Sequence, residues 1–240
     1  MAGGSVKNDS ISAELAKRKL HALSAPEVAA STARFFRTGP GQYGEGDVFI
    51  GVRVPAMRVL ARELRGLPLQ ETGLLLSSAI HEERHLALLV MVLQMAKSGE
   101  RQREELYDLY LGGTRYINNW DLVDCSAPHV VGSFLLHKAR EPLFRLAESH
   151  SLWERRIAIV STQHFIRHGD LTDTFLLGRR LLHDAEDLIH KATGWMLREA
   201  GIRDESLLLA FLDQHAPEMP RTMLRYAMER LPAELRRRYL

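Results

Sequence analysis

The chain has 240 residues, of which 45% are hydrophobic and 26% are charged, a balance typical of a globular domain with a sizeable core. Its 32 basic and 30 acidic residues give a formal net charge of +2, which neither requires nor excludes a nucleic-acid partner. The single cysteine, Cys125, excludes an intrachain disulfide framework and a cysteine-rich zinc site. We predict neither a metal nor another cofactor.

The first ten residues contain glycine, serine and asparagine but no apolar stretch. We expect 1–10 to form a flexible N-terminal tail rather than a signal peptide, followed by a single domain over 11–240. No run approaches the roughly 18 apolar residues that cross a membrane. With the single cysteine, this favours a cytoplasmic protein, associated with the nucleoid if the organism is bacterial.

Helical periodicity recurs along most of the chain. The first signal is the segment Ser24-Ala-Pro-Glu27, whose serine and glutamate fit a capping box before a helix that continues through Phe36. Apolar residues at three- and four-residue spacing then predict further helices. These helices are expected at 55–64, 82–97, 153–167, 171–182, 187–200, 204–214 and 220–230.

The segment TGPGQYGEGDVFIGVRV (38–54) interrupts this pattern as a glycine-rich loop insertion. In its second half Val48, Ile50 and Val52 alternate with other residues, which predicts a short extended segment. The glycine spacing matches neither the Walker nor the Rossmann phosphate-binding pattern. We therefore interpret 38–54 as a structural or functional loop inside a helical protein.

The helices come in pairs joined by short loops. The predicted helix at 171–182 is followed by 187–200, and 204–214 is followed by 220–230. Short connections make neighbouring helices antiparallel. We therefore predict an all-α fold, a right-handed solenoid of HEAT/ARM-like helix pairs.

The second helices of the pairs share a column of polar positions. One alignment of their apolar patterns places His85, Asp124, Arg156, Lys191 and Arg221 in equivalent positions. Equivalent positions in a solenoid lie along one surface, and a row of cations neutralises phosphates. The column therefore predicts a concave DNA-binding face that uses the four basic-type members of the set.

Asp124 is the exception in this column, because a carboxylate weakens binding to a polyanion. In a functional interpretation, Asp124 takes part in a reaction at an electron-poor centre. The alternative is an ion pair with Arg156 of the next repeat, and the cations of the column then form an ordinary solvated face.

All three tryptophans lie one helical turn from the column. Trp120 precedes Asp124 by four residues, Trp153 precedes Arg156 by three, and Trp195 follows Lys191 by four. Aromatic faces beside cations suit sugars and bases. The alternative is that each tryptophan is a core residue.

Four segments resemble the AlkD family of alkylpurine DNA glycosylases, and the resemblance covers roughly residues 30–230. The segments are GVRVPAMRVLARE (51–63), WDLVDCSAP (120–128), LWERRIAI (152–159) and HKATGWMLRE (190–199). The resemblance implies a monomer without a cofactor that acts in base excision DNA repair on double-stranded DNA. It also implies hydrolysis of the N-glycosidic bond of positively charged alkylated purines, such as 3-methyladenine or 7-methylguanine.

The same resemblance implies roles for four residues. The second aspartate of the W-D-x-V-D motif, here Asp124, is the catalytic carboxylate. Trp120 and Trp195 occupy the tryptophan positions of two motifs, and Arg156 is the arginine of L-W-x-x-R. Two features depart from the family pattern: Asn119 stands where a second aromatic can precede the motif, and the insertion at 38–47 is longer.

Two other functions remain open from the sequence. One is a non-catalytic HEAT-repeat protein that binds damaged or branched DNA through the same cations and the glycine-rich loop. The other is a scaffold for a protein partner, which predicts apolar or mixed residues in the column instead of cations.

Overall fold

The computed structural model describes residues 11–239, so the predicted tail at 1–10 lies outside the described residues. Within this range the chain forms helices and connecting segments without a β-strand, which confirms the all-α prediction. No helix in this range is long and apolar enough to cross a membrane. By their contacts the residues fall into two compact units, with the boundary along the chain between Ile117 and Asn118. The single domain over 11–240 stays a prediction.

The N-terminal unit is organised around α5, which is buried along most of its length. Helices α3, α4 and α6 pack against α5, and α1 packs against α3 and α4. The predicted helices at 55–64 and 82–97 correspond to α3 and α5. The elements are α1 (Ala13–His21), α2 (Pro26–Phe35), α3 (Val54–Glu63), α4 (Leu69–Leu76), α5 (His81–Met95), α6 (Glu100–Gly112) and a 3₁₀ turn, η1 (Thr114–Tyr116).

The glycine-rich loop is anchored at its C-terminal end by the first turn of α5. The Glu82 carboxylate accepts hydrogen bonds from the backbone N–H groups of three consecutive residues, Ile50, Gly51 and Val52, at 2.8 to 3.3 Å. Because Glu82 is 3% exposed, these bonds satisfy a buried charge. The extended half of the loop thus forms no strand beyond a single parallel bridge between Val48 and Ile80.

Asp47 provides a second anchor for the same loop. Its carboxylate contacts Nδ1 of His81 at 3.0 Å and accepts a hydrogen bond from Nη2 of Arg84 at 2.5 Å. Burial works against ionisation of Asp47, but His81 and Arg84 outweigh it and hold the pKa of this carboxyl below its ordinary value. Two buried carboxylates, Asp47 and Glu82, therefore hold the end of the loop just before α3 begins.

The start of α2 is held by the loop backbone instead of a serine cap. The helix begins at Pro26, and its N-cap residue is Ala25, which makes no side-chain cap hydrogen bond. The Ala25 N–H donates to the carbonyl of Ile50 at 3.1 Å. The predicted capping box of Ser24 and Glu27 is therefore wrong, although proline does occupy the first turn.

Gly51 lies where α2 and the loop approach most closely. Its φ of +83° is in the left-handed region, and a Cβ atom there would lie 2.1 Å from the carbonyl oxygen of Ala25 and 2.6 Å from the nitrogen of Ala29. Only glycine satisfies both the conformation and the space.

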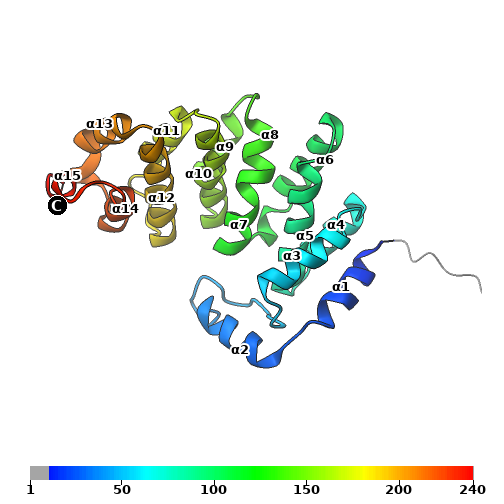
Figure 1. Cartoon of the computed structure of the whole chain (residues 1–240). Coiled ribbons are helices and arrows are strands. Elements are labelled where there is room, and N and C mark those ends of the chain that lie inside the picture. Colours follow the sequence, from blue (N-terminus) through cyan, green and yellow to red (C-terminus); the bar gives the residue numbers. More distant parts are fainter. Residues whose placement is uncertain (1–10, 240) are drawn as a thin grey trace, which may run out of the picture. The chain divides into compact units, whose positions relative to one another are not determined.

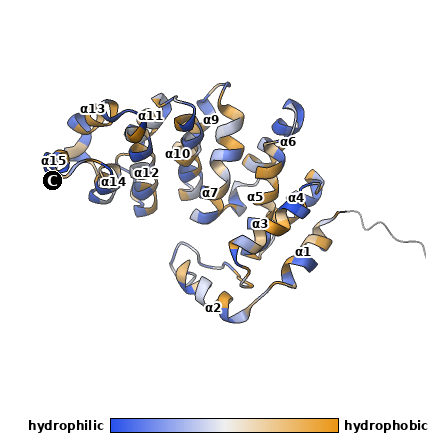
Figure 2. Cartoon of the chain, viewed as in Figure 1, coloured by the Kyte–Doolittle hydropathy of each residue, from blue (hydrophilic) through white to orange (hydrophobic). Residues whose placement is uncertain are grey.

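The C-terminal unit contains two rows of helices in Figure 1, with α7, α10, α12 and α14 in one row and α9, α11 and α13 in the other. Successive members of the first row pack on one another, and α9, α11 and α13 each pack on a member of it. Many helices of the chain carry both hydrophobic and hydrophilic residues, as amphipathic helices do (Figure 2). The elements are α7 (Trp120–Ala127), the π-helical turn η2 (Pro128–Gly132), α8 (Ser133–Leu135), α9 (Glu141–Ala147), α10 (Leu152–Arg167), α11 (Thr172–Arg180), α12 (Asp187–Arg203), α13 (Glu205–His215), η3 (Ala216–Glu218), α14 (Arg221–Ala227) and α15 (Ala233–Arg237).

Two glycines, one in η2 and one in α12, let neighbouring helical segments approach closely. A Cβ atom on Gly132 would lie 2.3 Å from the Ser161 carbonyl oxygen on α10, and one on Gly194 of α12 would lie 2.5 Å from the Met223 carbonyl oxygen on α14. These contacts fix the register between neighbouring helices, and that register positions the site.

We predict that Gly51→Ala destabilises the protein far more than Gly41→Ala. Gly41 has a similar φ of +71° but no atom within 4 Å of an added Cβ, so its substitution introduces only backbone strain of about 1 kcal/mol. Gly51→Ala adds a steric clash with backbone and is expected to cost at least about 3 kcal/mol in the free energy of unfolding. Urea unfolding of both variants measures the difference, and equal costs would contradict the close approach.

Candidate active site

The site begins at the N-terminus of α7. Asn119 is fully buried and extended, and its Oδ1 accepts a hydrogen bond from the Trp120 N–H at 2.8 Å, so it caps the helix. The residue that departs from the family pattern thus has a structural role here. Trp120, the first residue of α7, is partly exposed one turn before Asp124.

Asp124 and Arg156 form a two-pronged ion pair between α7 and α10. Nε and Nη2 of Arg156 donate to the two carboxylate oxygens of Asp124 at 2.9 and 2.8 Å. Nη1 of Arg156 donates to the carbonyl of Leu188 in the first turn of α12 at 2.5 Å. The ion pair considered from the sequence is therefore present, and one guanidinium links three successive helices.

The two partners differ in exposure. The Arg156 side chain is 6% exposed and the Asp124 side chain is 20% exposed, so the carboxylate is the member that solvent or a ligand can reach. Burial raises the pKa of Asp124 above its ordinary value, and the charge and hydrogen bonds of Arg156 oppose that rise. The guanidinium thus favours the ionised carboxylate at this position.

The predicted column has a simple structural basis. Asp124, Arg156 and Lys191 are each the fifth residue of their helices, α7, α10 and α12, and His85 is the fifth residue of α5. Arg221, however, is the first residue of α14, and the fifth is Arg225. By this criterion the residue equivalent to Lys191 is Arg225, one turn after the predicted Arg221.

A pocket between α12 and α14 supports this register. Lys191 and Arg225 both line it, together with Asp187, Thr222, Tyr226 and Glu229. Lys191 forms an exposed ion pair with Asp187 at 2.8 Å, and the Lys191 side chain is 41% exposed. Arg221 and Arg225 are both exposed on α14. Exposed cations thus follow one another from α12 to α14.

Trp195 is fixed by a carboxylate that sequence reasoning missed. Its Nε1 donates to Glu199 at 3.2 Å, and Arg198 donates to the same oxygen at 3.0 Å. Arg198 also pairs with Glu229, which lies just after α14. The signal was available, since Glu199 follows Trp195 by one helical turn inside the quoted motif. The indole is half-buried and its orientation is set by this network.

The remaining predicted residues lie in different surroundings. His85 is 3% exposed, which argues against direct contact with a phosphate. Trp153 is partly exposed in the first turn of α10. The neighbouring Arg155 forms an ion pair with Asp184 at 2.6 Å, so it is engaged within the protein.

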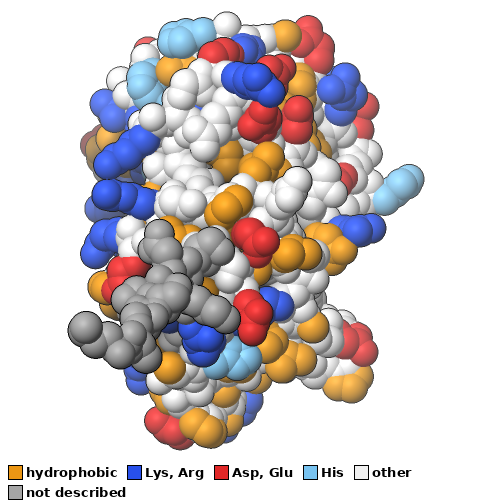
Figure 3. Space-filling view, turned by 90° about the vertical axis from the view of Figure 1, so that its right-hand side faces the viewer, with side chains coloured by type: hydrophobic (Ala, Val, Ile, Leu, Met, Phe, Trp, Pro, Cys, Tyr) orange, Lys and Arg blue, Asp and Glu red, His pale blue; other side chains and the backbone are white. Residues whose placement is uncertain are grey.

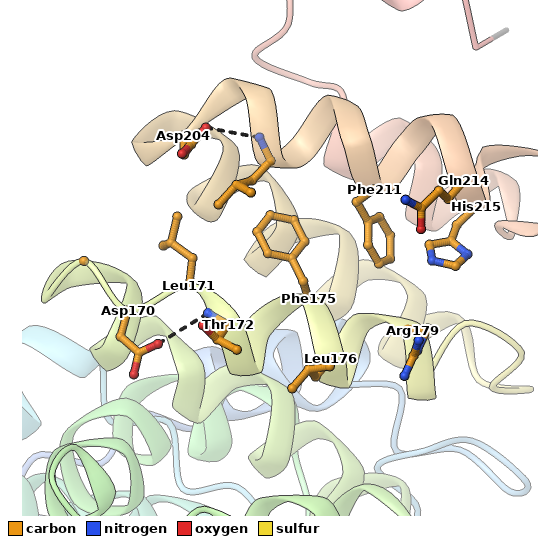
Figure 4. Close-up of a pocket in the computed structure, with 12 residues that line it drawn as sticks. Asp170, Leu171, Thr172, Phe175, Leu176, Arg179, Asp204, Phe211, Gln214 and His215 are labelled. Carbon is orange, nitrogen blue, oxygen red and sulfur yellow. Dashed lines mark hydrogen bonds between the residues drawn. The ribbon is translucent and has the colours of Figure 1, made fainter.

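An apolar groove lies between α11 and α13 of the second row (Figure 4). Leu171, Phe175 and Leu176 come from the first of these segments, and Phe211 faces them from the second. Asp170 and Asp204 cap backbone N–H groups at one end. None of the predicted site residues lines this groove; Asp124, Arg156 and Trp195 lie on α7, α10 and α12.

A family model described as DNA alkylation repair enzyme matches residues 16–231. The chain belongs to this family. Its fold is similar to the solved structure of a predicted DNA alkylation repair enzyme from Enterococcus faecalis, with a TM-score of 0.69 and 17% sequence identity over 88% of this chain and 97% of that chain. No curated protein matches the chain. The resemblance found in the sequence is thus confirmed for a DNA alkylation repair family.

We predict that Arg156→Ala destabilises this DNA alkylation repair family member by about 3 kcal/mol at neutral pH, because it leaves a largely buried carboxylate without its partner. Lys191→Ala, which removes an exposed ion pair, is the control and is expected to cost less than about 1 kcal/mol. Urea unfolding of both variants measures the difference.

The effect of Arg156→Ala is expected to depend on pH. Without the guanidinium the folded-state pKa of Asp124 rises further, so the loss of stability grows as pH rises above the ordinary aspartate range and shrinks where Asp124 is protonated. The same free-energy loss at about pH 4 and about pH 7 would contradict this coupling.

Proposed function

We propose that the protein is a DNA-alkylpurine N-glycosylase that hydrolyses the bond between deoxyribose and a positively charged alkylated purine in duplex DNA. The observation that carries the proposal is the partly exposed Asp124 carboxylate, held by Arg156 beside Trp120 in a member of a DNA alkylation repair family. The substrate class follows from the resemblance to the AlkD family.

The alkylated purine needs no strong acid to protonate it as a leaving group, because it already carries a positive charge. The bond from C1′ to the base nitrogen breaks and its electron pair neutralises the base, which leaves an oxocarbenium-like sugar. A water oxygen then bonds to C1′ and loses a proton. Asp124 stabilises the developing positive charge and orients this water.

The other residues support that carboxylate. Arg156 holds Asp124 ionised and correctly oriented, so its main role is positioning. A contact between Arg156 and a phosphate stays a prediction, for which two of its N–H groups remain after the bonds described above. Trp120 and Trp195 pack on the deoxyribose and favour its cationic transition state.

We further propose that the successive helix pairs are HEAT-like repeats whose DNA-binding face is the row formed by α7, α10, α12 and α14. The fifth residues of these helices, with intervals of 32, 35 and 34 residues (156 − 124, 191 − 156 and 225 − 191), support this repeat. Lys191, Arg221 and Arg225 contact phosphates on that face, and Trp153 lies beside it.

The decisive experiment measures release of free 7-methylguanine from a methylated duplex. The wild-type protein is expected to release the base, and Asp124→Asn is expected to lower the rate by at least about 100-fold with DNA affinity nearly unchanged. Asp121→Asn removes a carboxylate from the same helix three residues earlier and is the matched control. Equal losses in both variants would remove the assigned role of Asp124.

Absence of release by the wild type, with binding to the duplex retained, would instead support the alternative of a non-catalytic protein that binds damaged or branched DNA. That outcome leaves the DNA-binding face in place and removes the hydrolytic role.

The register of the last repeat is testable through salt dependence. Arg225→Ala is expected to weaken duplex binding and to lower the slope of log K against log salt by about 0.9, the value for one lost phosphate contact. The matched control is Arg230→Ala, an exposed arginine just after α14. Equal slopes for Arg225→Ala and wild type would contradict the contact.

A further inference from the structure

Helix α3 of the N-terminal unit and the turn that follows it carry three arginines, Arg58 and Arg62 on the helix and Arg65 in the turn. Arg58, Arg62 and Arg65 follow one another at intervals of four and three residues, the spacing of one helix face, and all three are exposed. The core-facing side of α3 is formed by Met57, Leu60, Ala61 and Leu64, which are at most 5% exposed. We call Arg58, Arg62 and Arg65 the arginine stripe.

The stripe is not neutralised by the protein. None of its three side chains has a carboxylate partner among residues 11–239. The one acidic residue of α3, Glu63, lies on the opposite flank and pairs with Lys19 of α1 at 2.9 Å. The stripe therefore concentrates three positive charges at the surface.

Several other arginines of the chain form ion pairs with carboxylates. Arg140 contacts Asp170 and Asp173, Arg155 contacts Asp184, and several more arginines are paired in the same way. In a chain with 32 basic and 30 acidic residues, three adjacent arginines without an acid indicate local segregation of charge. Lys and Arg side chains also gather along one edge of the face drawn in Figure 3, so the small net charge conceals an uneven distribution.

The helix that carries the stripe is held rigidly. Its core side packs on α5, and its N-cap residue, Arg53, directly follows the loop segment whose three N–H groups bind Glu82. Cations on a fixed helix lose little backbone entropy when a ligand binds. The loop anchor therefore also fixes the start of the stripe.

We propose that the arginine stripe is a second DNA-backbone contact, carried by the N-terminal unit and separate from the site at Asp124. This inference rests on the proposed function only for the choice of duplex DNA as the polyanion. At 1.5 Å per helical residue, Arg58 and Arg62 are about 6 Å apart along the axis of α3. Duplex DNA carries one negative charge per about 1.7 Å of its axis, so neighbouring guanidinium groups have phosphates within reach. Arginine also binds phosphate oxygens in a two-pronged geometry.

The test compares two triple variants of the full chain on an unmodified duplex. Arg58→Ala/Arg62→Ala/Arg65→Ala removes the stripe, and Arg101→Ala/Arg145→Ala/Arg203→Ala removes three other exposed arginines and the same net charge. The stripe variant is expected to lower the slope of log K against log salt by about 2 to 3, and the control variant by less than about 1. A third variant with lysine at the three stripe positions is expected to retain most of the slope.

Equal slopes for the stripe and control variants would overturn the proposal, and so would a wild-type chain without affinity for the duplex. A reduced slope in the stripe variant without rescue by lysine would also count against it, because loss of packing would then explain the effect. The proposed function is tested separately by single-turnover release of 7-methylguanine at saturating protein. This release depends on Asp124 and is expected to be nearly unchanged in the stripe variant.

Discussion

The ion pair between Asp124 and Arg156 joins residues 32 positions apart and thereby determines how α7 lies on α10. The third donor of the same guanidinium reaches the backbone of α12 at Leu188, so one buried cation sets the mutual position of three helices. A carboxylate that acts by its charge must be ionised and immobile before the substrate arrives. Burial disfavours the charged form and raises the pKa of Asp124, and Arg156 offsets part of that rise.

This arrangement divides the arginines and lysines of the protein into two groups by burial. Arg156 is buried and its hydrogen bonds are directed at protein atoms, so it acts on structure and on the neighbouring charge. Lys191, Arg225 and the arginine stripe are exposed, where an internal ion pair contributes little and an external phosphate competes well. We therefore propose that arginine serves orientation where it is buried and phosphate binding where it is exposed.

The sequence predicted most of the column because helix periodicity is a local property. Asp124, Arg156 and Lys191 keep a constant distance from their helix starts, and this distance is readable in the apolar pattern. Arg221 was assigned instead of Arg225 because both fit the apolar spacing of a short helix. The sequence could not predict the hydrogen bond from Arg156 to the Leu188 carbonyl or the burial of His85, because both depend on how separate helices pack.

Local rules also failed where distant backbone replaces a side chain. Ser24 has the composition of a cap, but Ala25 is the N-cap residue and donates its N–H to Ile50, more than twenty residues away. Nothing in the local sequence signals this bond.

The attachment of the glycine-rich loop to α5 through Asp47 and the N–H groups of residues 50–52 has an evolutionary consequence. Residues 38–46 can gain or lose length while α3 stays in place, because Glu82 and His81 hold the chain after the variable part. Insertions before the anchor are therefore a route by which relatives can acquire new surface chemistry without disturbing the helices.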